Sequence, residues 1–192
     1  MSAPSSIRLR AATVADAATF SAWDREPHVI RCTTDDPEAQ TAFDGVDWEA
    51  EFRDPTPFFE YLVGEAEGRP VGAMLIIDPH LEPTHYWGEI EANLRAIDIW
   101  IGPGDALNRG FGTAMMRQAI DRCFAAPDVT AIVIDPLTSN EAAHRFYRRL
   151  GFRQEGRRWF GEDDCLVHRL ERSRWTALSP PLGGDDRQVR VT

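Results

Sequence analysis

Residues Ala96-Ile97-Asp98-Ile99-Trp100-Ile101 and Leu107-Asn108-Arg109-Gly110-Phe111-Gly112-Thr113 form the stretch that decides the fold. The first run alternates around a carboxylate and predicts a strand. The second places glycines ahead of apolar residues at helical spacing, so we predict a helix over residues 115–126. Glycines let a backbone approach a ligand, and free amides at a helix start attract anions. The stretch therefore indicates a site for a phosphate-bearing cofactor, or else a simple tight turn.

Length and composition are those of one globular domain. The chain has 192 residues, of which 43% are hydrophobic, enough for a full core. No apolar run approaches the roughly 20 residues of a membrane helix, and residues 1–6 do not resemble a signal peptide. We therefore expect a cytoplasmic protein with no membrane partner. The cysteines lack metal-ligand spacing and are expected to be free thiols, and no metal site is predicted at His85 or His144.

The charge of the chain is strongly negative, with a formal net charge of -10. All 21 basic residues are arginine, because the sequence contains no lysine. This composition excludes a Walker-type phosphate loop and Schiff-base lysine chemistry. An acidic surface repels nucleic acid and attracts cationic ligands, so we expect no nucleic-acid partner. The alternative is that the acidity only aids solubility.

Hydrophobic periodicity and turn residues predict an α/β fold with a mixed sheet. Strands are expected over residues 7–11, 58–65, 71–77, 96–101, 130–134, 152–158 and 165–170. Helices are expected over residues 14–25, 47–53, 115–126 and 141–150. A capping box of Thr13 and Asp16 would start the first helix, and Pro27 would follow its end. Residues 78–94 are expected to be an irregular binding loop, and residues 173–192 a disordered tail.

The segment Ser139-Asn140-Glu141-Ala142-Ala143-His144-Arg145-Phe146-Tyr147-Arg148-Arg149-Leu150-Gly151-Phe152 carries the most specific pattern in the chain. Together with the strand around Asp98 and the turn at Gly110, it resembles the GNAT superfamily of acetyl-CoA-dependent N-acetyltransferases. Within that superfamily the chain looks like the aminoglycoside 6'-N-acetyltransferases over residues 7–23 and 95–156. The similarity is poor over residues 31–90, where that family binds its acceptor. Leu107 also stands where the superfamily usually has Gln or Arg.

The resemblance implies a fold and an activity. The fold is a mixed, mostly antiparallel central sheet flanked by helices, in a domain over residues 1–172. The activity is direct acetyl transfer from acetyl-CoA, in a ternary complex, to a primary amine of a small cationic acceptor such as an aminoglycoside-type aminosugar. The protein would be a monomer or a homodimer. Alternatives are a siderophore lysine or hydroxylysine acyltransferase, a protein N-acetyltransferase, and a non-catalytic acetyl-CoA-binding sensor, which would not need both Asp98 and Tyr147.

The resemblance also implies where CoA binds. The backbone amides of the glycine turn would hold its pyrophosphate, namely those of Arg109, Gly110, Phe111, Gly112 and Thr113. Arg109 would also supply the positive charge that Leu107 lacks. The strand residues Ile99, Trp100 and Ile101 would pair with the pantetheine arm, and an amide there would act as an oxyanion donor. Asn140 would bond the pantetheine or an ordered water.

Two residues are expected to carry the chemistry. Tyr147 would be the general acid for the departing thiolate, since a phenol holds its proton at neutral pH. Without the resemblance it would be interpreted as a core aromatic. Asp98 would deprotonate or hold the acceptor amine, and its apolar neighbours favour a raised pKa. The alternative for Asp98 is an ion pair with an arginine.

Further residues are expected to contact the acceptor. Asp135 would bind the acceptor or cap a turn before Pro136. Tyr86 and Trp87 would pack on sugar rings or anchor their loop. The three loop acids Glu82, Glu89 and Glu91 would add negative potential that attracts a polycation. Each is expected to be solvated and not in direct contact with the acceptor.

Overall fold

A computed structural model describes residues 7–43 and 45–178. Its strands are β1 Ile7–Ala11, β2 Phe59–Ala66, β3 Arg69–Ile77, β4 Leu94–Ile101, β5 Ala131–Ile134, β6 Arg153–Phe160 and β7 Asp163–Glu171. Its α-helices are α1 Ala17–Trp23, α2 Pro27–Thr33, α3 Trp48–Arg53, α4 Phe111–Ala125, α5 Glu141–Arg149 and α6 Arg172–Leu178. Short 3-10 helices cover η1 Val14–Asp16 and η2 Gly104–Ala106. The predicted α/β class is confirmed.

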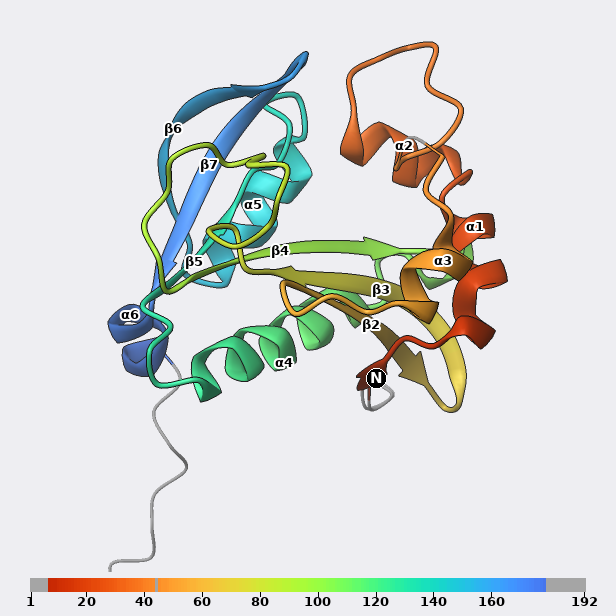
Figure 1. The fold of residues 1–192 in the computed structure, drawn as a ribbon, viewed down its shortest axis with the longest axis horizontal. Coiled ribbons are helices and arrows are strands. Elements are labelled where there is room, and N and C mark those ends of the chain that lie inside the picture. Colours follow the sequence, from red (N-terminus) through yellow and green to blue (C-terminus); the bar gives the residue numbers. More distant parts are fainter. Residues whose placement is uncertain (1–6, 44, 179–192) are drawn as a thin grey trace, which may run out of the picture.

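The strands form one sheet in the order β1-β2-β3-β4-β5-β7-β6. Every neighbouring pair is antiparallel except β4 and β5, which run parallel. Figure 1 shows α4 beneath the β2–β4 part of the sheet and α1, α2 and α3 gathered at one end. The mixed, mostly antiparallel sheet flanked by helices is therefore as the sequence predicts.

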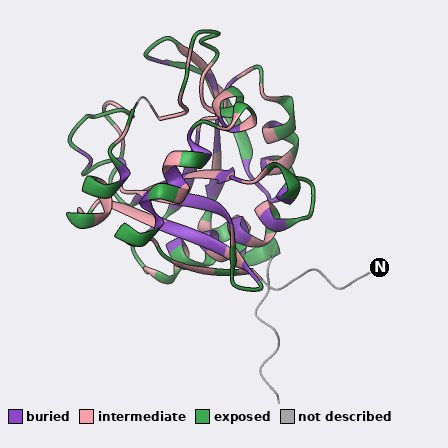
Figure 2. Ribbon diagram, turned by 90° about the vertical axis from the view of Figure 1, so that its right-hand side faces the viewer, coloured by how far each residue is buried: buried purple, intermediate pink, exposed green. Residues whose placement is uncertain are grey.

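Side chains of alternating residues in the central strands pack into two separate hydrophobic cores, one on each face of the sheet. Leu62 of β2 and Met74 of β3 pack with α4, whereas the adjacent Val63 and Ala73 pack against α1, α2 and α3. This is the two-residue period of a strand buried on both faces. In Figure 2 the strands are the mostly buried part of the molecule, while the outer faces of the helices are exposed. The sheet is thus the rigid base on which the loops are mounted.

The parallel pair β4 and β5 separates before β4 ends. Its register pairs Leu94 with Ala131 and Ala96 with Val133, and no pairing continues beyond that point. Strand β4 runs on to Ile101, still paired with β3 on its other edge. One edge of β4 is therefore left without a strand partner over its last residues.

Three helix boundaries differ from prediction. The first helix is divided into η1 and α1, although the predicted capping box of Thr13 and Asp16 is present. Pro27 starts α2 instead of only ending a helix. Proline fits the first helical position because the backbone N–H there has no hydrogen-bond acceptor within the helix. Helix α4 starts at Phe111, four residues earlier than predicted, directly after Gly110.

The predicted disordered tail is wrong for its first residues. Residues 172–178 form α6, where Trp175 is 6% exposed and donates its indole N–H to Asp121 Oδ1 at 2.7 Å. Arg172 donates to the carbonyls of Phe124 at 2.6 Å and Val129 at 2.7 Å. These bonds satisfy carbonyls left free after α4, which explains the docking. The rest of that prediction, residues 179–192, lies outside the described residues.

Over the described residues, no helix is both long enough and apolar enough to span a membrane. Nor do three or more His, Cys, Asp or Glu side chains in this part of the chain gather in a group that would hold a metal ion. Cys32, Cys123 and Cys165 are free thiols.

Candidate active site

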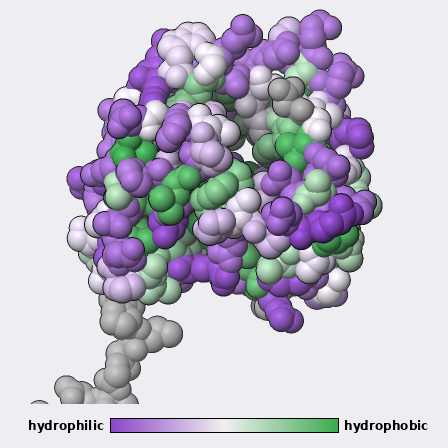
Figure 3. Space-filling model, in the orientation of Figure 1, coloured by the Kyte–Doolittle hydropathy of each residue, from purple (hydrophilic) through white to green (hydrophobic). Residues whose placement is uncertain are grey.

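The gap between β4 and β5 opens into a cavity of about 760 Å³. Figure 3 shows a hollow on this side of the molecule, with hydrophobic surface at its rim. On one side its lining comes from β4, the glycine turn, α5 and the end of β5, where Tyr86 bonds Asp135. On the other side it comes from α2 and residues 42–43. The lining includes the predicted residues Asp98, Ile99, Trp100, Ile101, Gly110, Gly112, Thr113, Asp135, Asn140, Tyr147 and Tyr86. Segments far apart in sequence thus meet at one place.

The free edge of β4 presents backbone groups to this cavity. Asn93 O accepts from Thr130 N on the β5 side, and backbone groups of a strand alternate between its two edges. By this alternation, Ile99 and Ile101 direct their amides into the gap. The Ile101 carbonyl already interacts with His28 Nε2 of α2 at 2.9 Å. Unpaired strand amides are donors ready for an extended ligand.

The glycine turn leaves the start of α4 open. Gly110 is the N-cap with φ of 83°, and no side chain caps the helix there. A β-carbon on Gly112 would only touch Phe146 at 4.0 Å, so the space in front of the amides is clear. Leu107, Asn108 and Thr113 also line the cavity. First-turn amides without a protein acceptor suit an anion, helped by the dipole of a 15-residue helix.

Arg109 and Phe111 differ from the other members of this turn. The Arg109 guanidinium lies over the Phe111 ring, 4.9 Å from its centroid, and the ring is buried beside Val71 and Ala106. Neither residue lines the cavity. Their side chains therefore fix the turn to the core, and only their backbone amides remain as candidate contacts.

Asn140 caps α5 and faces the cavity. Its Oδ1 accepts from the amide of Ala143 at 3.0 Å, which stabilises the helix start. Its side-chain NH₂ has no protein acceptor among the described residues. One half of the amide is thus structural, and the other half is free to bind a ligand.

Tyr147 lies on the same helix, in the cavity wall. The residue is 8% exposed, and within residues 7–43 and 45–178 its hydroxyl has no hydrogen-bond partner. Burial raises the pKa of this phenol well above its ordinary value, and the charges of Asp98 and Asp135 raise it further. Tyr147 also packs on Phe152 in the core. It is both a core aromatic and a protonated donor facing the cavity.

Asp98 lies on β4 and enters the cavity beside the free strand edge. No arginine of the described chain pairs with it, unlike Asp78, which Arg95 binds at 3.0 Å. Burial raises the pKa of Asp98 to about 7, and the negative charge of Asp135 adds to the rise. A carboxyl with this pKa changes protonation near neutral pH, which suits proton transfer.

Asp135 follows β5 and faces the same space. Tyr86 Oη donates to Asp135 Oδ2 at 2.7 Å, and burial raises the pKa of the Asp135 carboxyl. The Tyr86 ring stacks on Phe160 with centroids 4.6 Å apart and an angle of 12°. The 78–93 loop is thereby fixed to the end of β5.

Trp87 does not lie where a substrate contact would be. It is 3% exposed, does not line the cavity and packs edge-on against Phe160 at 5.0 Å. Its carbonyl is held by Arg158. Trp87 is therefore an anchor of its loop, which corrects the expected sugar contact.

The loop acids also differ from expectation. Glu82 is 2% exposed and accepts from Thr84 N at 2.9 Å, Thr84 Oγ1 at 2.5 Å and Tyr86 N at 2.5 Å. It is a buried anchor and not a solvated charge. Glu91 pairs with Arg169 on β7. Glu89 is exposed, as expected.

Several cavity residues escape sequence interpretation. Cys32, Thr33, Ala42, Phe43 and Asp163 all line the cavity. Asp24 is 4% exposed, and its Oδ1 accepts from the amides of Ala42 and Phe43, each at 2.9 Å. In the sequence, the only sign of this contact is that Asp24 lies shortly before Pro27, where α2 starts. That position does not reveal a hydrogen-bond partner 18 residues away.

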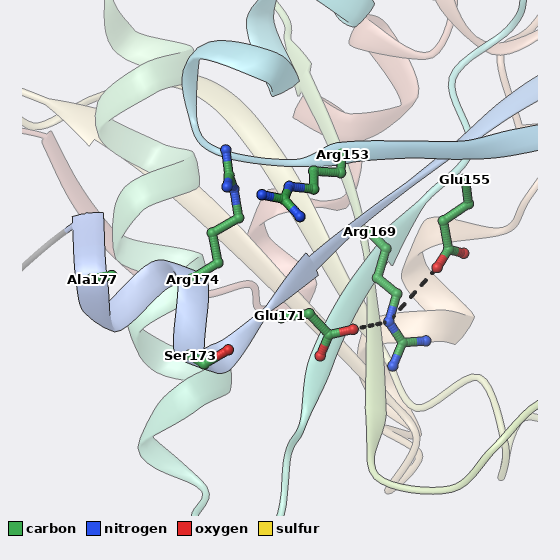
Figure 4. Close-up of a pocket in the computed structure, with 7 residues that line it drawn as sticks. All are labelled: Arg153, Glu155, Arg169, Glu171, Ser173, Arg174 and Ala177. Atoms are coloured by element: carbon green, nitrogen blue, oxygen red, sulfur yellow. Dashed lines mark hydrogen bonds and ion pairs between the residues drawn. The ribbon is translucent and has the colours of Figure 1, made fainter.

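A second depression, of about 580 Å³, lies between β6, β7 and α6. Figure 4 shows Arg169 there with Glu171 and Glu155, at 2.6 and 3.8 Å. Arg174 is turned to the Gly151 carbonyl at 2.5 Å. Arg153 is the guanidinium of this lining without a partner among the described residues, and both carboxylates of the lining face Arg169. The depression therefore has no unpaired acid like Asp98.

Buried histidines form a pair behind α5. His144 and His168 are 3.1 Å apart between Nδ1 and Nε2, and His144 Nε2 meets the Thr138 carbonyl at 3.3 Å. Burial lowers the pKa of His168 to about 4, and the pair carries no metal-like third ligand in the described part of the chain.

The sequence is similar to a known family and to several named proteins. A family model described as "Acetyltransferase (GNAT) domain" matches residues 12–160. A kanamycin resistance protein of Rhizobium radiobacter is 35% identical over 77 residues, 40% of this chain and 71% of that protein. An aminoglycoside N(6')-acetyltransferase type 1 of Klebsiella pneumoniae is 31% identical over 102 residues, 53% of this chain but 49% of that protein.

Solved structures share the fold. The structure of AAC(6')-Ib in complex with ribostamycin and coenzyme A superimposes with a TM-score of 0.77. The match covers 93% of this chain and 98% of that chain at 22% sequence identity. At 22% identity this similarity shows only that the helices and strands are arranged in the same fold.

Proposed function

The chain belongs to the GNAT family of acetyltransferases, and from that membership we propose that it moves an acetyl group from acetyl-CoA to a primary amine of an aminoglycoside. Asp98 is the observation that carries the proposal. It is an unpaired carboxylate with a pKa of about 7, across a free strand edge from an unpartnered phenol. The names of the relatives favour an aminosugar acceptor over other amines.

The cavity wall fits CoA. The uncapped amides that follow Gly110 would hold the pyrophosphate, and the free edge of β4 would pair with the pantetheine arm. The free half of the Asn140 amide would bind the same arm. When bound, acetyl-CoA supplies a thioester carbonyl that an amine attacks.

Asp98 would act on the acceptor. As a carboxylate it holds the ammonium group by charge, and with a pKa near 7 it accepts the proton that the amine must lose. An amide of Ile99 or Ile101 would donate to the carbonyl oxygen of the acetyl group as negative charge grows there. Holding the amine and acetyl-CoA in one cavity also lowers the entropic cost of bringing the two reactants together.

Tyr147 would act on the leaving group. Its raised pKa keeps the phenol protonated at neutral pH, so it is a donor and not a base. A hydroxyl that has no protein partner among the described residues can turn to a sulfur atom beside it. Proton donation to the departing thiolate then completes the transfer.

The acceptor half of the cavity favours cations. Three carboxylates line it, Asp98, Asp135 and Asp163, whereas Arg149 is the single guanidinium of the described lining. A polyamine would neutralise these charges, and a neutral sugar would not. The negative charge of the whole chain also speeds encounter with a polycation.

A thiol-release assay tests the proposal. Purified protein with acetyl-CoA should release free CoA thiol when kanamycin or tobramycin is added, and none without an amine. Release with lysine derivatives alone would move the proposal to a siderophore-type or protein acceptor. Heat of CoA binding without turnover on any amine would instead indicate a sensor.

We further propose that the enzyme works in the cytoplasm as a monomer or homodimer, with no nucleic-acid partner. Residues 7–178 act as one catalytic domain, because α6 docks on α4. Sedimentation of the purified chain measures its assembly state.

A further inference from the structure

Three hydrogen bonds join the two walls of the cavity. Thr34 Oγ1 donates to Asp163 Oδ1 at 2.9 Å, and the amide of Asp35 donates to the same oxygen at 3.3 Å. Ser139 Oγ donates to Asp35 Oδ1 at 2.7 Å. The partners are 104 to 129 residues apart in sequence, so the contacts depend on the tertiary fold. We call residues 33–35 the strap.

The strap crosses from one wall of the cavity to the other. On its near side, Cys32 and Thr33 line the cavity from α2. On its far side, Asp163 lines the cavity from β7, and Ser139 immediately precedes Asn140, another lining residue. Burial raises the pKa of the Cys165 thiol in that wall, and the nearby charges of Asp135, Asp163 and Asp35 add to the rise. The strap therefore bridges the α2 side and the β7 side of the cavity.

The strap is held weakly. Asp35 and Ser139 are exposed, Thr34 is half-buried, and no strap side chain belongs to a buried core. Exposed hydrogen bonds compete with water, so each contributes little to the net stability of the closed strap. The bonds also bring the carboxylates of Asp35 and Asp163 near each other, which opposes closure. A segment with few apolar contacts opens at low cost.

We propose that the strap selects acceptors by size, with Thr34 and Ser139 as specificity-determining residues. This inference rests on the proposed acetylation of an amine. A small acceptor reaches Asp98 beneath the closed strap. A larger acceptor must break the three bonds first, and that cost lowers its kcat/KM.

The test compares a two-ring acceptor, neamine, with a four-ring acceptor, neomycin, which contains the same two rings and the same amines on them. In the double variant Thr34→Val with Ser139→Ala, which removes two of the three bonds, kcat/KM for neomycin should rise about five- to hundredfold relative to that for neamine. Thr176→Val is the matched control, since its hydroxyl bonds Arg172 O at 3.0 Å on α6, remote from the cavity. The control should leave the ratio unchanged.

Hydrogen exchange gives a readout that does not need turnover. The amides of residues 33–36 should exchange faster in the double variant than in the parent chain and the control. If no amine is acetylated by the parent chain, the proposed function fails while exchange still reports on the strap. Unchanged exchange, or faster exchange with an unchanged ratio of the two acceptors, would overturn the inference.

Discussion

The two walls of the cavity are built in different ways. The cofactor wall consists of β4, the turn at Gly110 and α5, whose free groups are backbone amides positioned by regular structure. The rest of the lining, which we propose for the acceptor and call the acceptor wall, comes from α2 and from irregular segments over residues 34–43, 45–47 and 78–93. Carboxylates hold these segments in shape. Asp24, Asp47 and Glu82 each accept bonds from nearby backbone amides. Acids in this protein therefore hold loops in place.

This difference separates two kinds of mutational effect. Changes at reacting groups should reduce turnover while both walls keep their shape. Changes at the loop carboxylates should affect acceptor binding and stability together, and leave CoA binding intact.

The largest effect is expected at Asp98, where the two walls meet. Asp98→Asn keeps the shape but cannot accept a proton, so kcat/KM for the acceptor should fall about 10²–10⁴-fold. In the parent chain kcat/KM should fall as pH drops through about 7, because the carboxylate becomes protonated. Steady-state kinetics from pH 5.5 to 9 checks both. A parent profile that is flat across this range would contradict the assignment.

The same substitution has an opposite effect on stability. The folded-state pKa of Asp98 is raised, so ionisation destabilises the fold as pH rises from about 4 to 7. Asp98→Asn removes that charge and should raise Tm at pH 8 but not at pH 4. Calorimetry at the two pH values measures the difference.

The next effect is expected at Tyr147, on the cofactor wall. Tyr147→Phe removes only the hydroxyl, so kcat should fall about 10²-fold while the Kd for CoA stays the same. Because Tyr147 is 8% exposed and packs on Phe152, circular dichroism must accompany the kinetics. Unchanged kcat in a folded variant would leave Tyr147 as a core aromatic only.

A smaller effect is expected at Glu82, on the acceptor wall. Glu82→Gln turns one acceptor oxygen into a donor that faces other donors, at a cost of about 1–3 kcal/mol in unfolding free energy. Tyr86 loses its support, so KM for the acceptor should rise several-fold. Glu89→Gln on the exposed side of the same loop is the control. Equal effects of the two variants would mean that the buried bonds do not shape the wall.

The smallest effect is expected at Asn140, where the helix cap made by Oδ1 can be separated from the proposed CoA contact made by the NH₂ group. Asn140→Asp keeps the cap oxygen but loses the NH₂ group, so unfolding free energy should change by less than about 0.5 kcal/mol. The Kd for CoA should rise about three- to tenfold. Asn140→Ala loses both roles, and a CoA affinity equal to that of the parent chain in both variants would remove Asn140 from the site.

The regular wall is predictable because each element carries its own signal. The alternation around Asp98 specifies β4, and the glycines before an apolar helix specify the turn. The pattern from Asn140 to Phe152 specifies α5 and its cap. Their meeting at the β4–β5 gap follows from strand order, which the family resemblance implies.

The irregular wall is less predictable, since local sequence does not say which way a loop side chain points. Sequence reasoning expects Glu82 in solvent and leaves Trp87 as either a sugar contact or a loop anchor, and both residues are buried. It also interprets Pro27 as a stop signal, and the same residue starts α2. Asp163 enters the cavity through the pairing of β7, far from any motif.

Helix α6 sets a practical limit on how the enzyme can be shortened or fused. Arg172 and Trp175 close the open ends of α4 and β5 from a position after the last strand. A chain truncated after Glu171 would therefore lose solubility and heat resistance, although it keeps every residue of the cavity. Affinity tags and reporter domains belong after Leu178, where they leave this closure in place.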